Sequence, residues 1–324
     1  MPGQLWAVDS LGGRLYAKRL SKELRTILQP MWRFRSFCDV KDETANGKGK
    51  GDTYTFDCVF NVQTQGGKLV ETDTMPETNF KILQNSGSVY EYGNAVPWTK
   101  KLEAMSQFNV RKPVMQALRN DAAKVLDNAA FDEFQKAQLT VVPKAGNSSA
   151  AITIGTASVG LTANALHLTK SHVRLIADTM QERNIPYYDG GNYIAIGRPT
   201  TFSTFKSEME AVNQYVTEGY RKIINGEIGK FENIRFVTQT QVAAAAEGTW
   251  GGGLSDWVMF FGEETVMEGI AEPENIISKI PEDYGRSKGI AWYFLGGFQL
   301  VHNWDTTVDT GAANGRIIKW TSPS

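Results

Sequence analysis

The sequence predicts an α+β protein built around one long helix. Three observations support this class. A strictly alternating pattern over residues 52–64 is typical of a half-buried strand, and a helical pattern runs unbroken from Arg111 to Gln138. Shorter helix and strand patterns then alternate as far as residue 320. Their order predicts one mixed sheet flanked by helices.

The central helix is predicted over residues 111–138. Pro113 lacks an N–H group and suits the first turn, and no glycine or further proline follows it in the pattern. Apolar side chains at three- and four-residue spacings define one face: Met115, Leu118, Ala122, Val125, Leu126, Ala129, Ala130 and Phe134. The opposite face is predicted to carry Arg119, Lys124, Asp127, Asp132 and Glu133. At roughly 39 Å the helix would exceed the usual length in globular proteins, although a long core helix of an enzyme domain is an alternative.

A long hairpin is predicted ahead of this helix. Its first strand directs five apolar side chains to one face: Tyr54, Phe56, Cys58, Phe60 and Val62. Gly66 and Gly67 turn the chain into a polar stretch over residues 68–85, and a second strand follows over residues 88–99. An isolated two-stranded hairpin is marginally stable in water, so we expect a neighbouring subunit to support its polar tip.

The downstream region supplies the compact part of the molecule. One helix is predicted from Ala165 to Arg183, with Thr162 or Asn164 as its cap, and another from Phe205 to Val216. Strands are predicted over residues 192–198, 234–238, 257–261, 275–280, 289–304 and 315–320. Residues 241–256, which contain an alanine run and three glycines, are expected to form a surface loop.

Residues 1–50 are predicted to form an arm rather than a domain. A helix over residues 15–28 and the segment after it carry clustered basic residues: Arg14, Lys18, Arg19, Lys22, Arg25, Arg33 and Arg35. The simplest interpretation is a solvated helix face; the functional alternative is a surface that faces phosphates. The glycine-rich link at residues 46–51 lacks the Gly-Lys-Ser/Thr ending of a nucleotide-binding P-loop.

Composition and motifs give no indication of catalysis. The 34 Lys and Arg residues nearly cancel the 35 Asp and Glu residues, so the chain as a whole is not a basic nucleic-acid coat. Cys38 and Cys58 have no metal-ligand spacing, and Cys58 is expected to be a small buried residue. The three histidines form no zinc motif and no nucleophile motif is present. We therefore predict no enzyme, no cofactor, no metal site, no signal peptide and no membrane span.

Several segments carry a family resemblance. The main one is YRKIINGEIGKFENIRFVT at residues 220–238, supported by EYGNA at 91–95, YIAI at 193–196, FG at 261–262, KIP at 279–281 and GIAW at 289–292. Together they resemble the major capsid proteins of tailed double-stranded DNA bacteriophages, and most closely the coat proteins of short-tailed phages. The resemblance covers roughly residues 50–305 and consists of turn and core residues.

The resemblance implies the Hong Kong 97 fold. Its parts would be an N-terminal arm at 1–50, an extended E-loop with flanking strands at 51–101, a P-domain spine helix at 102–139 and an A-domain at 140–305, whose last strands return to the P-domain. A C-terminal strand or tail would occupy 306–324.

The implied function is a structural protein of the virion. It would be made in the host cytoplasm and self-assemble, as pentamers and hexamers, into an icosahedral head around double-stranded DNA. A separate scaffolding protein, a portal protein and a decoration or cement protein are the further expected partners. An encapsulin-like compartment shell and a soluble α/β enzyme are the alternatives.

Particular residues follow from this interpretation. The E-loop is predicted to contact neighbouring subunits through Lys68, Glu71, Asp73, Glu77 and Lys81, and hinges are predicted at Gly47, Gly49, Gly51, Gly66 and Gly67. Non-specific DNA contact is predicted for the basic arm residues from Arg14 to Arg35 named above.

Overall fold

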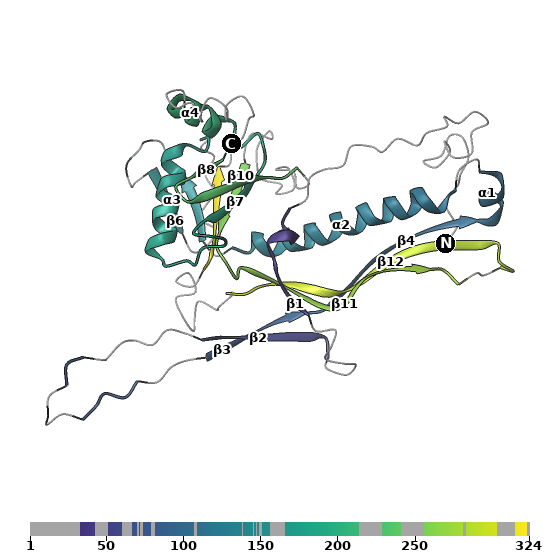
Figure 1. Cartoon of the computed structure of the whole chain (residues 1–324), viewed down its shortest axis with the longest axis horizontal. Helices are drawn as coiled ribbons and strands as arrows, with labels where there is room; N and C mark the ends of the chain where they lie inside the picture. The colour runs from purple at the N-terminus through teal and green to yellow at the C-terminus, as the bar shows by residue number, and fades with distance from the viewer. Residues whose placement is uncertain are drawn as a thin grey trace.

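The computed structural model describes residues 33–42, 51–59, 67–69, 71, 74–78, 82–106, 109–137, 139–144, 146, 148, 151–155, 166–213, 229–240, 256–280, 283–302 and 315–322. It has an elongated part, in which a long helix lies along a twisted sheet, and a more compact part at one end of that helix (Figure 1). The protein is therefore a mixed α+β structure, as the sequence predicts.

The long helix is α2, Arg111–Gln135. It begins where the sequence predicts and ends three residues earlier than predicted, at Gln135. At 1.5 Å per residue its 25 residues span about 37 Å. Its apolar side packs on β4, β11 and β12, so the helix and sheet bury each other.

The elongated sheet has the strand order β1-β11-β12-β4. The strands are β1 (Asp39–Asp42), β11 (Val266–Ser278), β12 (Ser287–Leu300) and β4 (Tyr90–Thr99). β1 runs parallel to β11, and the other neighbours are antiparallel. β4 leads into the short helix α1 (Lys100–Met105), which Thr99 caps by accepting a hydrogen bond from the Leu102 N–H.

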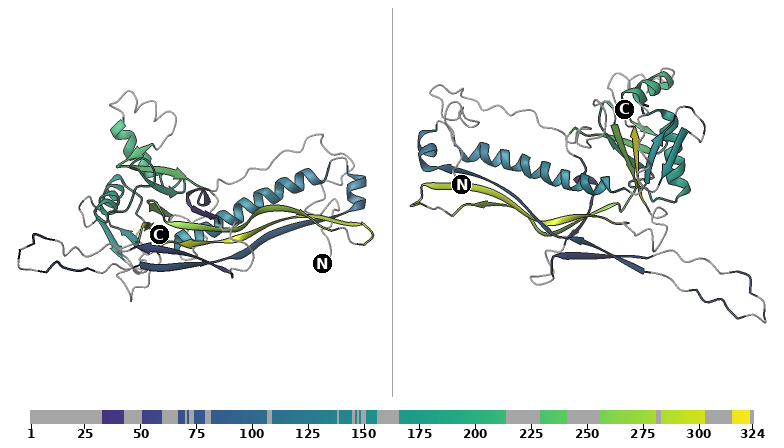
Figure 2. Two further views of the ribbon diagram at one scale, coloured as in Figure 1. Left: turned by 60° about the horizontal axis from the view of Figure 1, so that its bottom comes forward. Right: turned by 180° about the vertical axis from the view of Figure 1, so that it is seen from behind.

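A two-stranded ribbon of β2 (Thr53–Val59) and β3 (Ile82–Ser88) lies on the other face of this sheet. Alternation along β12 fixes the two faces: Phe298 belongs to the core under α2, whereas the neighbouring Gly297 faces the ribbon residue Tyr54. The three views agree on the order helix, sheet, ribbon (Figures 1 and 2).

The predicted hairpin pairing is wrong. β2 pairs with β3, which begins inside the stretch that the sequence marks as polar, whereas the predicted second strand is β4 and pairs with β12. Gln84 and Ser86 of β3 are exposed, so this strand has no clear apolar alternation from which the sequence could predict it. Cys58 is also only half-buried, which corrects the prediction of full burial.

The compact part contains a seven-stranded mixed sheet, as predicted from the sequence, but the predicted strands at 275–280 and 289–304 belong to β11 and β12 of the elongated sheet instead. In spatial order its strands are β6 (Ile152–Gly155), β5 (Leu139–Pro143), β13 (Ile317–Ser322), β10 (Asp256–Phe261), β7 (Tyr193–Gly197), β9 (Ile234–Thr238) and β8 (Lys230–Phe231). The helices are α3 (Lys170–Glu182) and α4 (Ser203–Asn213). The cap of α3 is Thr169, not the predicted Thr162 or Asn164, because its hydroxyl accepts from the His172 N–H at the actual start.

Two hydrophobic clusters meet across β10. Val258 and Phe260 face α3 and its neighbours, while Trp257, Met259 and Phe261 face the cluster that includes the end of α2. The alternation along one buried strand therefore joins the compact part to the elongated part through a continuous core.

Candidate inter-subunit surfaces

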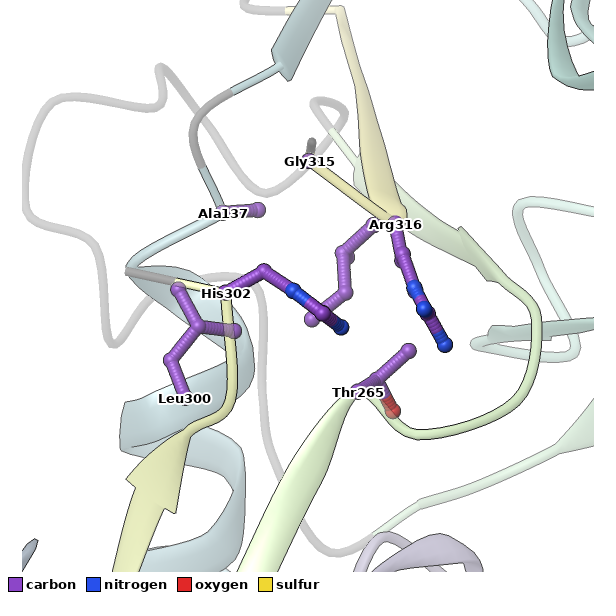
Figure 3. A pocket seen from close by; sticks show the side chains of 7 residues that line it. Ala137, Thr265, Leu300, His302, Gly315 and Arg316 are labelled. Atoms are coloured by element: carbon purple, nitrogen blue, oxygen red, sulfur yellow. The ribbon is translucent and has the colours of Figure 1, made fainter. Parts of the chain in front are cut away.

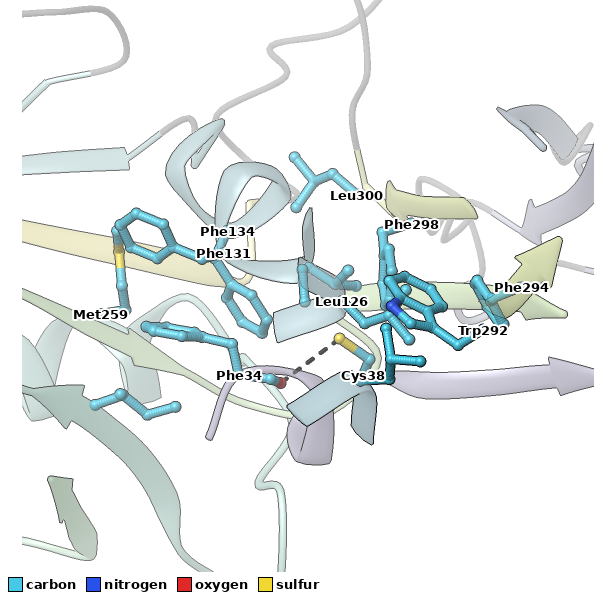
Figure 4. Packing of buried hydrophobic residues seen from close by; sticks show 14 of the residues in the cluster. Phe34, Cys38, Leu126, Phe131, Phe134, Met259, Trp292, Phe294, Phe298 and Leu300 are labelled. Carbon is cyan, nitrogen blue, oxygen red and sulfur yellow. Dashed lines mark hydrogen bonds between the residues drawn. The ribbon is translucent and has the colours of Figure 1, made fainter. Parts of the chain in front are cut away.

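The arm is tied to the body at the segment Arg33–Cys38, here called the arm junction. Phe34 is fully buried, with its ring 4.9 Å from that of Phe131 and 5.6 Å from that of Phe134. Figure 4 shows Phe34 among these rings and the Cys38 thiol hydrogen-bonded to the Phe34 carbonyl. Two aromatic rings of α2 thus hold the arm junction against the core.

Asp127 receives the backbone of the arm junction. Its carboxylate accepts hydrogen bonds from the N–H groups of Arg33 (3.3 Å) and Arg35 (3.0 Å). Burial raises the pKa of Asp127, although these hydrogen bonds act in the opposite direction. The sequence places Asp127 and Glu133 on the exposed face of the helix, which is wrong: both are buried, and Asp127 is buried because the arm junction covers it.

Arg35 is held by two acids of β11 and is not a free DNA contact, which corrects its predicted role. Its guanidinium pairs with Glu268 at 2.7 Å and also with Glu274, and it lies over the Phe294 ring. Burial lowers the pKa of Arg35, but these hydrogen bonds outweigh it and the pKa rises. The register of β11 shifts between Glu268 and Glu274, so one arginine ties both sides of an irregular strand.

Of the other predicted DNA-facing residues, Arg33 is exposed at the arm junction. The rest lie outside the described residues: Arg14, Lys18, Arg19, Lys22 and Arg25.

The base of the ribbon is anchored on the sheet. The Tyr54 hydroxyl donates a hydrogen bond to the Gly297 carbonyl at 3.1 Å, and Asn85 donates to the carbonyls of Leu300 and Val301. The close approach requires glycine, because a Cβ at Gly297 would lie 2.0 Å from the Ser88 carbonyl oxygen. Sequence reasoning missed this anchor, although glycine inside a strand is a signal of close backbone approach.

Beyond its base the ribbon carries apolar side chains that the described chain leaves exposed: Val59, Leu69, Met75 and Ile82. Lys68, Glu71 and Glu77, which are predicted E-loop contacts, are exposed on the connection between its strands. Asp73 and Lys81 lie outside the described residues. A two-stranded ribbon is too thin to bury these apolar side chains in a core of its own. Exposed apolar side chains grouped in this way are typical of interaction surfaces.

The predicted hinge glycines are only partly described. Gly51 has a φ of +84°, and a Cβ at Gly67 would meet nothing within 4 Å. Gly47, Gly49 and Gly66 lie outside the described residues.

A second exposed apolar surface is the distal hairpin, formed by residues 275–287 where β11 turns into β12. Ile276 and Ile277 are exposed, Ile280 is 83% exposed, and Tyr284 is completely exposed. The tip lies at the end of the elongated part farthest from the compact part (Figure 1). Both surfaces therefore project away from the cores.

A small cavity lies where β12 and β13 meet, beside His302, Arg316 and Thr265 (Figure 3). Its volume of about 10 Å³ corresponds to a single water, far below the size of a substrate pocket. Burial, followed by the charge of Arg316, lowers the pKa of His302 to about 4. We interpret this cavity as a small packing defect between the ends of the strands and not as a ligand site.

Within the described ranges, no group of His, Cys, Asp and Glu side chains is placed to hold a metal ion. The helices in that part of the chain include none with the length and apolar character needed to cross a membrane. His172 is buried, with Nε2 3.1 Å from the Lys144 carbonyl oxygen, in keeping with a structural role.

Comparisons with known proteins place this architecture. A family model described as phage capsid protein matches residues 84–308, which is more than half of the chain. No curated protein sequence matches.

Solved capsids share the fold. A capsid chain of cyanophage Pam1 is 15% identical with a TM-score of 0.70, over 98% of this chain and 99% of that one. Capsid chains of Ralstonia phage GP4 (15% identical, TM-score 0.67, 98% of both chains) and Helicobacter pylori bacteriophage KHP30 (11% identical, TM-score 0.68, 95% of both chains) are similar. The Hong Kong 97 fold predicted from the sequence is confirmed, and the chain belongs to the phage capsid protein family, as a major capsid protein of the phage head.

Proposed function

We propose that the ribbon and the distal hairpin are the surfaces through which this capsid protein joins its neighbours. In this proposal pentamers and hexamers close into an icosahedral head around double-stranded DNA. The observation that carries it is the exposed apolar surface of the ribbon, Val59, Leu69, Met75 and Ile82, on an element whose hydrogen bonds to the sheet, among the described residues, lie at its base. A two-stranded ribbon is marginal alone, and a neighbouring subunit supplies the missing cover.

The polar residues of the connection would form the rim of this contact. Lys68, Glu71, Asp73, Glu77 and Lys81 surround the apolar side chains in the sequence, and charged groups at an interface rim fix register more than affinity. Gly47, Gly49, Gly51, Gly66 and Gly67 would let the ribbon and arm adopt the different angles that pentamers and hexamers require.

The remaining assignments follow the Hong Kong 97 layout. We assign residues 1–50 to the arm, 51–101 to the E-loop, 102–139 to the spine, 140–305 to the A-domain with its return strands and 306–324 to the C-terminal strand. The short-tailed phage branch, synthesis in the host cytoplasm, DNA contact by the arm, and the scaffolding, portal and decoration partners belong to the same proposal. An enzyme is not proposed, because the family is structural.

The test replaces Met75, which is 72% exposed, with Glu and compares it with Met75→Leu. We expect both variants to unfold at the temperature of the unaltered chain, since the side chain is in solvent. Particles, followed by size exclusion and negative-stain microscopy, should form with Met75→Leu and fail with Met75→Glu. Normal shells from Met75→Glu would refute the ribbon contact. Protein cargo in place of DNA inside shells from infected cells would favour the encapsulin alternative.

A further inference from the structure

We propose that the outward side of the first three turns of α2 binds the phosphate backbone of the packaged DNA, so that the α2 side of the subunit faces the interior of the shell. The surface is called the basic strip and comprises Arg111, Lys112 and Arg119 with the amide side chains of Asn109, Gln116 and Asn120. The inference rests on the proposed head assembly and adds the site and the orientation.

The strip is a continuous surface along one side of the helix. Its residues line an open hollow of about 500 Å³ together with Met115. Arg111, Lys112 and Arg119 are all exposed, while Val114 and Leu118 of the same turns are buried against the sheet. The side chains, not the helix N–H groups, form this surface: Asn109 accepts from the Arg111 N–H, and Pro113 has none.

Among the residues that the structure describes, none neutralises the positive charge of the strip. In the described part of the chain, the side chains of Arg111, Lys112 and Arg119 take part in no ion pair and no hydrogen bond. The sequence has no Asp or Glu from residue 104 to residue 120.

The two flanking acids point elsewhere. Asp121 faces the sheet and accepts from the Trp292 indole N–H at 2.9 Å, and Glu103 pairs with Lys288 at 2.6 Å. Three cations without a counter-charge therefore share one helix side.

On the opposite face, the described residues of the ribbon carry more exposed acids than bases. The ribbon, which lies beyond the sheet, exposes Asp57, Glu71 and Glu77 against Lys68. In the described part of the chain, the basic strip therefore lies on the α2 side and the excess of acids on the ribbon side. A polyanion is attracted to the first and repelled by the second, so the α2 side is the one that suits contact with a genome.

The arm enters the body on this same side. Gln116 of the strip and Phe134 are 18 residues apart, about five full turns, and so point the same way. Phe134 contacts Phe34 of the arm junction. The strip thus continues the side of α2 against which the arm junction packs.

The spacing fits non-specific phosphate contact. Lys112 and Arg119 are seven residues apart, about 10 Å along the helix, or about three steps of 3.4 Å along one DNA strand. The amide groups of Asn109, Gln116 and Asn120 can donate further hydrogen bonds to phosphate oxygens. No base-reading element is present in the strip, so binding is expected to be independent of sequence.

The first test compares two triple variants that remove the same charge. Arg111→Gln/Lys112→Gln/Arg119→Gln changes the strip; Lys170→Gln/Arg174→Gln/Lys230→Gln changes three exposed cations elsewhere. Binding of unassembled protein to a double-stranded DNA fragment is measured across a salt series. Each lost phosphate contact lowers the slope of log K against log salt by about 0.9, so the strip variant should lose about 2 to 3 and the control little. Equal losses in both variants, or none in the strip variant, would overturn the proposal.

Assembly is scored in the same preparations. The strip variant should form shells as the unaltered chain does. A strip variant that keeps its DNA slope but forms no shells would overturn the proposal in favour of a protein contact, with the acidic ribbon of a second copy or a separate assembly protein. If the unaltered chain forms no shells, the assembly proposal fails, and the salt slope still decides whether the strip binds DNA.

Orientation has its own readout. Gln116→Cys, in a chain carrying Cys58→Ser, leaves Cys38 as the other cysteine, and that residue is buried. We expect a bulky polymer-linked maleimide to label Cys at 116 in unassembled protein but not in intact shells, where a small maleimide still reacts. Labelling of intact shells by the bulky reagent would place the strip outside and overturn the proposal.

Discussion

The ion pair between the arm junction and β11 gives a sharp stability prediction. Arg35→Met removes the guanidinium while keeping a side chain of similar length. It leaves the Glu268 carboxylate, which is 2% exposed, without the three hydrogen bonds that Arg35 donates to it.

The magnitude follows from the burial of Glu268. Breaking a buried pair by removing one partner costs roughly 3–5 kcal/mol, because a buried charge is left uncompensated. The Arg35 side chain is 27% exposed, so water screens part of the interaction and we expect about 3 kcal/mol. Glu274 is more exposed than Glu268, and Glu274→Gln should cost less than about 1 kcal/mol.

The loss should also depend on pH. Burial already raises the pKa of Glu268, and Arg35 is the group that opposes this rise. Without Arg35 the folded protein holds a proton on Glu268 more tightly than the unfolded chain does. Stability of Arg35→Met therefore increases as the pH falls from 7 towards 5, and its deficit against the unaltered chain shrinks.

The assay is urea unfolding of unassembled protein, followed by tryptophan fluorescence, because Trp257 and Trp292 lie in the same core. Arg35→Met, Glu268→Met and the double variant complete a mutant cycle. We expect the double variant to be more stable than Arg35→Met by about 2 kcal/mol, since no unpaired carboxylate remains. Additive losses, or a pH-independent deficit, would show that Arg35 acts through packing alone.

Three further outcomes follow from the structure. Gly297→Ala should displace the ribbon at a cost of about 1–3 kcal/mol and speed amide exchange in β3, because the new Cβ would lie 2.0 Å from a backbone oxygen. Gly289→Ala is the control, since the nearest atom to its Cβ would be 3.3 Å away and the substitution should be tolerated better. Equal amide exchange in the two variants would contradict the anchor. The pKa of His302 is lowered from 6.5 to about 4, so the unfolded chain binds the proton first and the protein should lose up to about 3 kcal/mol of stability as the pH falls from 6.5 to 4. His302→Gln should flatten the pH dependence of the melting temperature in that window. An unchanged pH dependence would contradict the role of His302. Ile280→Ser/Tyr284→Ser should leave the stability of the subunit within about 0.5 kcal/mol but slow shell formation in light scattering, and unimpaired assembly would remove the distal hairpin from the contacts.

Local patterns predicted the elements that bury one face against this chain's own core. The start of α2 at Arg111 and the strand Ile234–Thr238 agree with the structure to the residue. The first half of β11 was missed because Glu268, Gly269 and Pro273 break its apolar pattern. Glu268 pairs with Arg35, which lies 233 residues earlier in the sequence. A pattern read over a short segment of sequence cannot include both partners.

The candidate surfaces were harder to predict for a related reason. Sequence patterns report which side chains the chain covers, and the ribbon and distal hairpin are defined by apolar side chains that it leaves uncovered, such as Met75 and Ile280. The basic strip shows the same difficulty from the other side. Arg119 was correctly placed on the exposed face of the helix, but that face divides into an N-terminal half in solvent and a C-terminal half in which the arm junction covers Asp127. Periodicity treats the two halves as one surface. Only the path of the arm separates them, and this path directs the search for DNA contacts to Arg111, Lys112 and Arg119 and away from Arg35.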